Sequence, residues 1–204
     1  MKSILLVGGG GHCHSCIDVI EAIGSYQIQG VVQPKVSAEL ILGYPIIGTD
    51  DDLPLLLKKT KSALITLGQI KTSETRIRFF DLLKQLGAEL PAIISPRAYC
   101  SKHAVVGEGS IVMHHAIVNA GARVGNNCIV NSQALVEHDV EIDDHCHIST
   151  GARINGNVSI GKGSFIGSGV IIKESINVGA NVLIGAGQVI FQDVPDGTVV
   201  RHGK

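Results

Sequence analysis

The chain has 204 residues and a net charge of −1, with 17 basic and 18 acidic side chains. The balanced charge excludes a basic footprint for nucleic acid or an anionic membrane surface, and no apolar stretch approaches the roughly 18 residues that span a bilayer. Apolar residues make up 45% but aromatic residues only 3%, so we expect a core of Val, Ile, Ala and Gly. Five cysteines without an export signal predict a cytoplasmic protein with reduced thiols.

Apolar runs of strand length alternate with stretches of helical periodicity through the first 96 residues. Strands are predicted over 4–7, 28–32, 63–67 and 91–94, and helices over 15–23, 51–59 and 72–86. Strand alternating with helix indicates a parallel sheet. We therefore expect a small α/β Rossmann-like domain over residues 1–96.

A run of four glycines, Gly8 to Gly11, follows the first predicted strand and precedes the first predicted helix. Backbone N–H groups and the helix dipole can bind phosphate in that place. The spacing is not G-x-G-x-x-G, and Gln33-Pro34 ends the second strand where a dinucleotide site needs an acidic residue. The run is therefore interpreted as a phosphate site or as a tight turn, not as a full dinucleotide site.

Two of the cysteines, Cys13 and Cys16, have the C-x-x-C spacing of a redox pair or of half a zinc site. No second C-x-x-C pair accompanies them, and Cys128 and Cys146 fall at small positions of the repeat described next. Buried packing residues are the better interpretation for all four.

Residues 97–204 follow a six-residue pattern. From Tyr99 to Val194 the sequence divides without a gap into sixteen hexapeptides, and the second position is Val or Ile in fifteen of them. A branched aliphatic residue every six positions fills the axis of a coil with three flat sides, so that residues 18 apart stack. The pattern predicts a parallel β-helix over residues 97–204. One predicted inner ladder is Val118, Val136, Ile154, Ile172 and Ile190.

His138 differs from the other histidines of the repeat by its neighbours. It lies between Glu137 and Asp139 at a predicted corner, and Gly156 one coil later leaves room for its ring. An imidazole beside carboxylates suits a general base near neutral pH. The other histidines of the repeat are explained as polar residues on solvated faces, and the residues alone leave both interpretations open for His138.

Five motifs, spread over nearly the whole chain, carry a resemblance to a known family. They are Gly8-Gly9-Gly10-Gly11-His12, Gly43-Tyr44-Pro45-Ile46-Ile47-Gly48, Asn131-Ser132 with Glu137-His138, His147-Ile148-Ser149-Thr150-Gly151, and Asn155-Gly156-Asn157-Val158-Ser159-Ile160-Gly161. In this order they resemble the bacterial NeuD/PglD-type sugar O- and N-acetyltransferases of the hexapeptide-repeat superfamily. The resemblance implies a Rossmann-like domain that binds the sugar, followed by a left-handed β-helix.

The resemblance also implies roles for individual residues. His138 would be the general base and Asp139 would orient it, while the backbone N–H of Gly156 would serve as an oxyanion donor. The residues implied to bind acetyl-CoA are His147, Gly156, Ser168 and Ala186. Those implied to bind the acceptor are Gly10, Gly11, His12, Gln33, Gly68 and Asn131. Direct transfer in a ternary complex needs no metal and no covalent enzyme intermediate.

The acceptor follows less directly from the resemblance. One version of the family acetylates the amine of a nucleotide-linked 4-amino-4,6-dideoxy sugar, and the other acetylates a hydroxyl of sialic acid or a related nonulosonic acid. We favour the amine of a UDP-linked sugar in surface glycan biosynthesis, because the glycine run suits a diphosphate.

Two departures from the family pattern bear on the ligands. Gln33 and Pro34 stand where members that use UDP-sugars often carry acidic residues, which puts nucleobase contacts in doubt. The chain also ends in 199–204, VVRHGK, and lacks the usual Gly-x-Pro-Ala-Lys tail, although its basic residues could meet the coenzyme phosphates.

Two other functions are open to this fold class. A zinc-dependent, γ-carbonic-anhydrase-like enzyme would need three histidines from neighbouring subunits, with His138, His145 and His147 as candidates. A non-catalytic solenoid would have no use for the Glu137-His138-Asp139 corner. The family resemblance further implies a homotrimer with each active site between adjacent β-helices.

Overall fold

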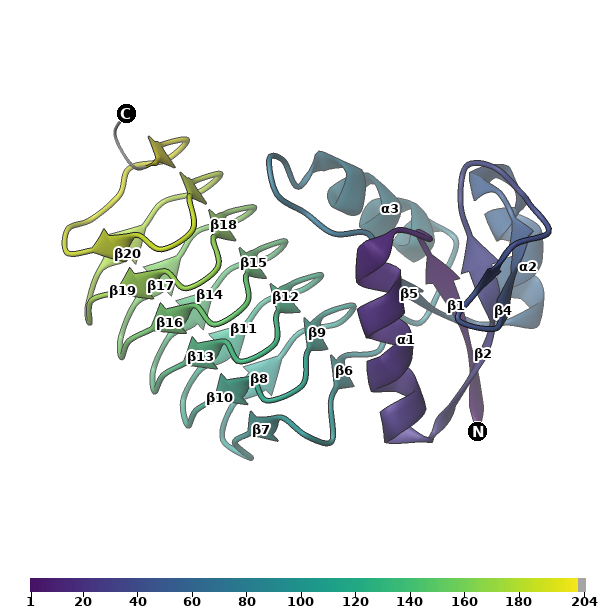
Figure 1. Ribbon diagram of the computed structural model, residues 1–204, viewed down its shortest axis with the longest axis horizontal. Helices are drawn as coiled ribbons and strands as arrows, with labels where there is room; N and C mark the ends of the chain where they lie inside the picture. The colour runs from purple at the N-terminus through teal and green to yellow at the C-terminus, as the bar shows by residue number, and fades with distance from the viewer. Residues whose placement is uncertain (202–204) are drawn as a thin grey trace.

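The computed structural model describes residues 1–201 and has two parts, an α/β part and a three-sided β-helix (Figure 1). The α/β part contains β1 (Lys2–Val7), α1 (Gly11–Ile23), β2 (Tyr26–Val32), β3 (Leu40–Ile41), β4 (Tyr44–Gly48), the 3-10 helix η1 (Asp50–Asp52), α2 (Leu53–Lys59), β5 (Ser62–Ile65) and α3 (Glu74–Gln85). The strands form one sheet in the order β3-β4-β2-β1-β5, parallel except for the hairpin of β3 and β4. This arrangement confirms the predicted α/β fold class.

The sheet carries a helical layer on each face. Side chains of β1 point alternately to the two sides: Ile4 and Leu6 share a core with α1, whereas Leu5 and Val7 share a core with α2 and α3. The core on the α1 side also takes in Ile111 of the β-helix. The two parts of the chain therefore share apolar packing and do not meet through a polar linker alone.

Three details of the α/β part differ from the prediction. Helix α1 begins at Gly11, earlier than the predicted residue 15, because Gly10 is extended and the turn is complete there. The β3–β4 hairpin was not predicted; left-handed conformations at Leu42 and Gly43 close it. The strand predicted over 91–94 exists as β6 (Ile93–Ile94), but it pairs with β9 of the β-helix and not with the α/β sheet. The β-helix thus begins before residue 97.

All sixteen predicted hexapeptides begin with a two-residue strand. These strands are β7 (Tyr99–Cys100), β8 (Val105–Val106), β9 (Ile111–Val112), β10 (Ile117–Val118), β11 (Arg123–Val124), β12 (Ile129–Val130), β13 (Leu135–Val136), β14 (Glu141–Ile142), β15 (His147–Ile148), β16 (Arg153–Ile154), β17 (Ser159–Ile160), β18 (Phe165–Ile166), β19 (Ile171–Ile172), β20 (Asn177–Val178), β21 (Leu183–Ile184) and β22 (Val189–Ile190). A last strand, β23 (Val199–Val200), follows outside the six-residue frame and pairs with β21.

The strands stack into three parallel sheets, which we call I, II and III. Sheet I holds β6, β9, β12, β15, β18, β21 and β23; sheet II holds β7, β10, β13, β16, β19 and β22; sheet III holds β8, β11, β14, β17 and β20. Partners lie 18 residues apart except in the pair of β21 and β23, where the separation is 16. The predicted ladder from Val118 to Ile190 is buried along sheet II. The chain turns from sheet I to II, from II to III and from III to I at three corners, named here after the sheets that they join.

The corners have their own sequence rule. The fifth residue of a hexapeptide has a positive φ in fourteen of the sixteen, and it is either Gly or a polar residue such as Asn, Asp or His. At the III–I corner, small side chains at the sixth position also bond between coils: Ser110, Cys128, Cys146 and Ser164 each donate to a backbone carbonyl fifteen residues later. Cys128 and Cys146 therefore pack as predicted and also hold the corner.

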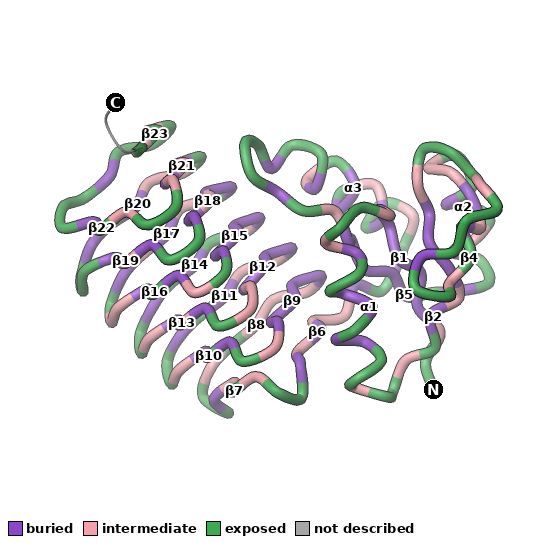
Figure 2. Tube along the Cα trace, viewed as in Figure 1, coloured by how far each residue is buried: buried purple, intermediate pink, exposed green. Residues whose placement is uncertain are grey.

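Sheet I carries the α/β part (Figure 1). Ile93, Ile111 and Ile129 in its outer column are fully buried, whereas Val199 of the same column is 52% exposed (Figure 2). Helix α1 lies toward the I–II corner, where its Asp18 contacts His114, and α3 lies along the III–I corner, where its Arg76 contacts Asn127. Among residues 1–201, no helix is both long and apolar enough to cross a membrane.

Candidate active site

His138 lies at the II–III corner, in the turn that follows β13. Its Nδ1 lies 3.0 Å from Asp139 Oδ2, so the carboxylate accepts the Nδ1 proton and Nε2 is left free to act as a base. Both side chains are about two-thirds exposed, at 64% and 67%. Asp139 occupies a fifth position with φ +58°, so the corner geometry turns its carboxylate back toward the ring.

The backbone around His138 keeps the ring close to Gly156. A Cβ atom on Gly156 would lie 2.6 Å from Cε1 and 2.7 Å from Nε2 of His138, so any larger residue would displace the ring from this position. Within residues 1–201 the amide of Gly156 has no acceptor, which leaves its N–H available beside the base. Glu137 accepts from Asn119 Nδ2 at 2.8 Å and from the His138 amide at 3.2 Å, and so holds the turn from the other side. These residues, Glu137, His138, Asp139 and Gly156, are called the His138 cluster below.

His147 has a different environment on sheet I, facing the α/β part. Its Nδ1 donates to the backbone carbonyl of Gln69 at 2.7 Å, and its Nε2 lies 3.3 Å from Asn131 Nδ2. Burial and the Arg76 guanidinium lower the pKa of His147 to about 4, although the Gln69 carbonyl acts in the opposite direction. The ring is therefore neutral at physiological pH and accepts hydrogen bonds at Nε2. In that state it can hold an N–H group of a ligand but cannot donate to a thioester carbonyl.

His12, at the start of α1, lies beside His147. The two ring centroids are 6.5 Å apart, and Gly68 lies against His12. Burial lowers the pKa of His12 to about 3, with smaller contributions from Arg76 and His147. In the described part of the chain its Nε2 is buried without a hydrogen-bond partner. An orphaned buried nitrogen is costly unless a ligand satisfies it. We call His12, Gly68, Asn131 and His147 the His147 cluster.

Gln33 lies at the carboxyl end of β2, across the glycine run. Its side chain folds over Gly9 and donates to the Lys35 carbonyl at 3.0 Å. A cavity of about 110 Å³ opens at this edge of the sheet, lined among others by Gly8, Gln33, Pro34 and Arg78. Parallel α/β sheets bind ligands at such an edge. Gly10 and Gly11 stand at the start of α1, with open space where each Cβ would be.

The predicted coenzyme residues Ser168 and Ala186 both lie at the I–II corner. Both are exposed. They occupy the same position of the hexapeptide as Thr150, and Thr150, Ser168 and Ala186 lie on three successive coils, 18 residues apart. Ser168 Oγ lies 3.0 Å from Ser149 Oγ. Of the basic C-terminal residues, Arg201 is exposed, whereas His202 and Lys204 lie outside the described residues.

One chain thus brings the predicted residues into two separate clusters. The His147 cluster, the glycine run and Ser168 lie toward the I–II corner, whereas the His138 cluster lies at the II–III corner. The three histidines considered as zinc ligands also lie apart. His145 is buried at the III–I corner, where its Nδ1 contacts Asn127 Nδ2 at 2.9 Å and its ring packs against Phe80.

Sequence reasoning missed the polar residues that join the two parts. Arg76 is 1% exposed and donates to the carbonyls of Ile65, Leu67 and Asn127 and to Asn127 Oδ1. Gln69 is 3% exposed although it lies in a loop. A charged residue on an amphipathic helix normally indicates a solvated face, so the pattern of α3 carries no signal for a buried arginine.

Comparison with known proteins identifies a matching family and solved structures of similar fold. The PglD N-terminal domain family matches residues 3–81. The acetyltransferase domain of PglB from Neisseria gonorrhoeae, solved with acetyl coenzyme A, is 33% identical with a TM-score of 0.89, over 97% of this chain and 95% of that one. PerB from Caulobacter crescentus, solved with CoA and GDP-perosamine, is 29% identical with a TM-score of 0.90, over 98% and 93%. No curated protein sequence matches the chain significantly.

The fold and these matches define an acyltransferase built on a left-handed parallel β-helix. The chain belongs to the hexapeptide-repeat sugar acetyltransferases that include the PglB acetyltransferase domain. WeeI from Acinetobacter baumannii, 21% identical with a TM-score of 0.83, shares the fold over 98% of this chain and 96% of its own.

Proposed function

We propose that the protein transfers the acetyl group of acetyl-CoA to the amine of a nucleotide-linked 4-amino-4,6-dideoxy sugar, in the UDP form, with His138 as general base. The observation that carries the proposal is the His138–Asp139 pair, in which Nε2 is free above the bare backbone of Gly156. An exposed imidazole whose other nitrogen donates to a carboxylate can take a proton, because the carboxylate stabilises the imidazolium that forms.

The chemistry follows from this geometry. The acceptor amine attacks the thioester carbon while His138 Nε2 takes the amine proton. The Gly156 N–H stabilises the oxyanion of the tetrahedral intermediate, and the C–S bond then breaks. The thiolate of CoA leaves and recovers a proton from the imidazolium, so the enzyme returns to its starting state. Asp139 holds the ring in the productive tautomer through both proton transfers.

The acceptor would be held by the His147 cluster and the glycine run. The diphosphate would meet the amides of Gly10 and Gly11 at the start of α1. The nucleoside would occupy the cavity beside Gln33, and the sugar would extend toward His12 and Asn131. The buried, unpartnered Nε2 of His12 supports a polar ligand at this place. The complex of PerB with CoA and GDP-perosamine supports a nucleotide-linked sugar as the class of acceptor.

The coenzyme would lie along the I–II corner. Its pantetheine arm would pass Ser168 and Ala186, which are exposed on successive coils, and would end at His147. The neutral His147 would accept an N–H of the coenzyme or of the acceptor at Nε2. The exposed Arg201 at the last coil would contact the phosphates at the far end.

We further propose that a homotrimer completes the site. The base and the ligand-binding residues lie at different corners of one chain, so a neighbouring chain would supply His138 to the I–II corner of the next. The outer column of sheet II, between these corners, presents exposed apolar residues such as Tyr99, Ile117 and Val189. Burying such a column between subunits is favourable.

The decisive experiment measures release of the CoA thiol with a panel of acceptors. UDP-linked and GDP-linked 4-amino-4,6-dideoxy sugars are compared with free sialic acid, and mass spectrometry identifies the product. We expect an amide product with the UDP-amino sugar. An ester of sialic acid as the product would show that the enzyme acetylates a hydroxyl and not an amine. Stoichiometric zinc in the purified protein would favour the γ-carbonic-anhydrase-like alternative. A monomer at assay concentration would contradict the shared site.

A further inference from the structure

The loop between β5 and α3, residues 66–73, joins the sheet of the α/β part to the β-helix. Gln69 lies in this loop with its side chain buried against two coils: its Nε2 donates to the carbonyl of His145 at 3.1 Å and to that of Gly163 at 3.3 Å. The backbone carbonyl of the same residue accepts the Nδ1 proton of His147 at 2.7 Å. Gln69 is therefore hydrogen-bonded to the III–I corner through its side chain and to sheet I through its backbone.

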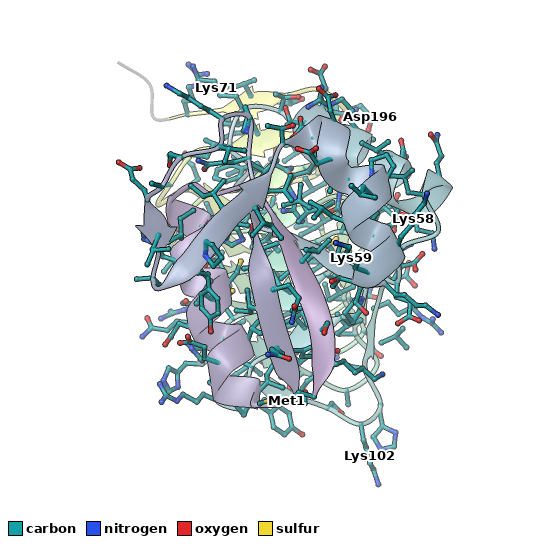
Figure 3. The ribbon with its side chains drawn as sticks, turned by 90° about the vertical axis from the view of Figure 1, so that its right-hand side faces the viewer. Met1, Lys58, Lys59, Lys71, Lys102 and Asp196 are labelled. Atoms are coloured by element: carbon teal, nitrogen blue, oxygen red, sulfur yellow. The ribbon has the colours of Figure 1, made fainter. Side chains whose placement is uncertain are left out.

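Both ends of the loop are also anchored. At the β5 end, Thr66 Oγ1 donates to the Gly8 carbonyl at 2.6 Å, in the glycine run. At the α3 end, the buried Arg76 donates to the carbonyls of Ile65 and Leu67 and across to Asn127 of the β-helix. Figure 3 shows how far the loop reaches: Lys71 lies at the same end of the molecule as Asp196 of the last coil, opposite Lys102 of the first. The loop is thus fixed between the two parts.

This anchoring decides the state of the His147 ring. A neutral imidazole carries its proton on either nitrogen, and the partner of one nitrogen determines which. Because a carbonyl can only accept, the Gln69 carbonyl holds the proton on Nδ1 and leaves the lone pair on Nε2. The ring also packs edge-on against Phe165, with centroids 5.2 Å apart, so the Nε2 side faces Asn131 and His12.

We propose that Gln69 is a positioning residue for acetyl transfer that acts through His147: its side chain fixes the loop so that its carbonyl keeps the proton on Nδ1 and the Nε2 lone pair of His147 directed toward Asn131 and the bound ligands. This inference rests on the proposed contact of His147 with acetyl-CoA. It adds a role for a residue that touches neither substrate. It also makes one loop the common support of the sugar-binding and coenzyme-binding residues, because Gly68 in the same loop lies against His12.

The test is a double-mutant cycle on kcat/KM for acetyl-CoA, with Gln69→Met and His147→Asn made singly and together. Methionine keeps the length and the packing of Gln69 but cannot donate to the two carbonyls. We expect Gln69→Met to lower kcat/KM about tenfold, the scale seen when the outer partner of a functional histidine is lost. In the His147→Asn background the same change should cost less than about twofold, because its effect runs through the absent ring. An equal loss in both backgrounds, or no loss in the single variant, would overturn the proposal.

Two further measurements need no acceptor sugar, so they separate this proposal from the proposed function. Nitrogen NMR of histidine-labelled protein reports the His147 tautomer, and titration calorimetry reports the affinity for acetyl-CoA. We expect the Nδ1–H tautomer in the wild type, a second tautomer in Gln69→Met and a weaker affinity for acetyl-CoA. A wild-type ring protonated on Nε2 would refute the inference even in an active enzyme. Failure of every acceptor, with these results intact, would count against the proposed function alone.

Lys84→Met is the matched control. Lys84 lies on α3 and also joins the two parts, through Glu108 at 2.8 Å, but it does not touch the loop. It should leave kcat/KM, the His147 tautomer and the acetyl-CoA affinity at wild-type values. If Gln69→Met fails to fold, Gln69→Leu serves in its place, since leucine is apolar and has no donor. An effect of Lys84→Met as large as that of the Gln69 variant would show a general effect of domain docking and would overturn the proposal.

Discussion

His138 and His147 lie nine residues apart in the sequence but in opposite environments. His138 is exposed at the II–III corner and donates to a carboxylate, whereas His147 is 6% exposed on sheet I and donates to a backbone carbonyl. A carboxylate stabilises the protonated ring, while burial beside a neutral carbonyl and a cationic arginine disfavours it. The comparison shows how one scaffold gives the same side chain two environments, an exposed one beside a carboxylate at the II–III corner and a buried one beside a backbone carbonyl on sheet I.

The largest expected effect lies in the exposed member of this pair. His138→Ala removes the base and should lower kcat by about 10² or more, the usual scale for a positioned general base. Its fold should be intact, because the side chain is exposed and the corner is held by backbone bonds. Steady-state CoA release at saturating substrates measures the effect. If His138→Ala turned over at the wild-type rate, His138 could not be the general base, and the proposed difference in function between His138 and His147 would be wrong.

The next effect concerns Arg76, the buried cation near His12 and His147. Arg76→Met would leave the carbonyls of Ile65, Leu67 and Asn127 without their donors. A buried group left unsatisfied costs about 1–3 kcal/mol, so we expect the free energy of unfolding to fall by about 3 kcal/mol or more. Denaturant titration measures it. The exposed Lys84–Glu108 pair on the same helix should contribute at most about 1 kcal/mol, as Lys84→Met will show.

The buried member should also make stability depend on pH. The pKa of His147 falls from 6.5 to about 4 on folding, so the unfolded chain binds more protons between these values. The stabilisation is complete above pH 6.5 and is lost as the pH falls toward 4. With about 1.4 kcal/mol for each pKa unit, His147 should account for about 2 kcal/mol of the loss between pH 7 and pH 5. The free energy of unfolding of His147→Gln, measured at both pH values, should therefore fall by about 2 kcal/mol less than that of the wild type. An equal fall in the variant and the wild type would contradict the buried neutral state of His147.

The smallest effect tests the space beneath the base. In Gly156→Ala the new methyl would meet the His138 ring, which must turn away from its position. We expect kcat to fall about tenfold, or about 1.4 kcal/mol in the barrier. Stability should change little, because the exposed ring is free to move and Ala120 occupies the equivalent position one coil below His138. A normal rate would show that the ring position above Gly156 is not the reactive one.

The β-helix could be predicted almost completely from the sequence because each hexapeptide repeats the same inward Val or Ile and the same small corner residue. The failures fall at its two ends. Ile93–Ile94 begins a hexapeptide in frame, but the prediction assigns it to the α/β domain over residues 1–96 as a strand of that sheet. Beyond β22 the frame shifts: Val194 takes the place of a strand by bridging to Val178, and Val199–Val200 follows a longer turn. End coils lack a neighbour on one side and so escape the constraint that makes the pattern regular.

The candidate site also contains residues that could be predicted from the sequence and residues that could not. The corner residues His138, Asp139 and Gly156 interrupt a regular pattern, so they could be singled out from the sequence. Gln69 and Arg76 could not, since their importance comes from carbonyls and an asparagine far along the chain. Hydrogen bonds to backbone carbonyls leave no residue-type signature in the partner. Contacts of this kind become visible only when the two parts are placed together.

The left-handed fifth position of the hexapeptide has a consequence for how such a molecule can change. A conformation that favours Gly, Asn, Asp or His places either glycine or a polar side chain at the corners of the coils, with no cost to the apolar ladder inside. Each coil of the solenoid therefore offers corner positions that can accept a reactive side chain, at a fixed spacing of one coil. Duplication of a single coil would copy such a position together with the backbone that supports it. Chemistry could then be gained or moved along the axis without a new fold.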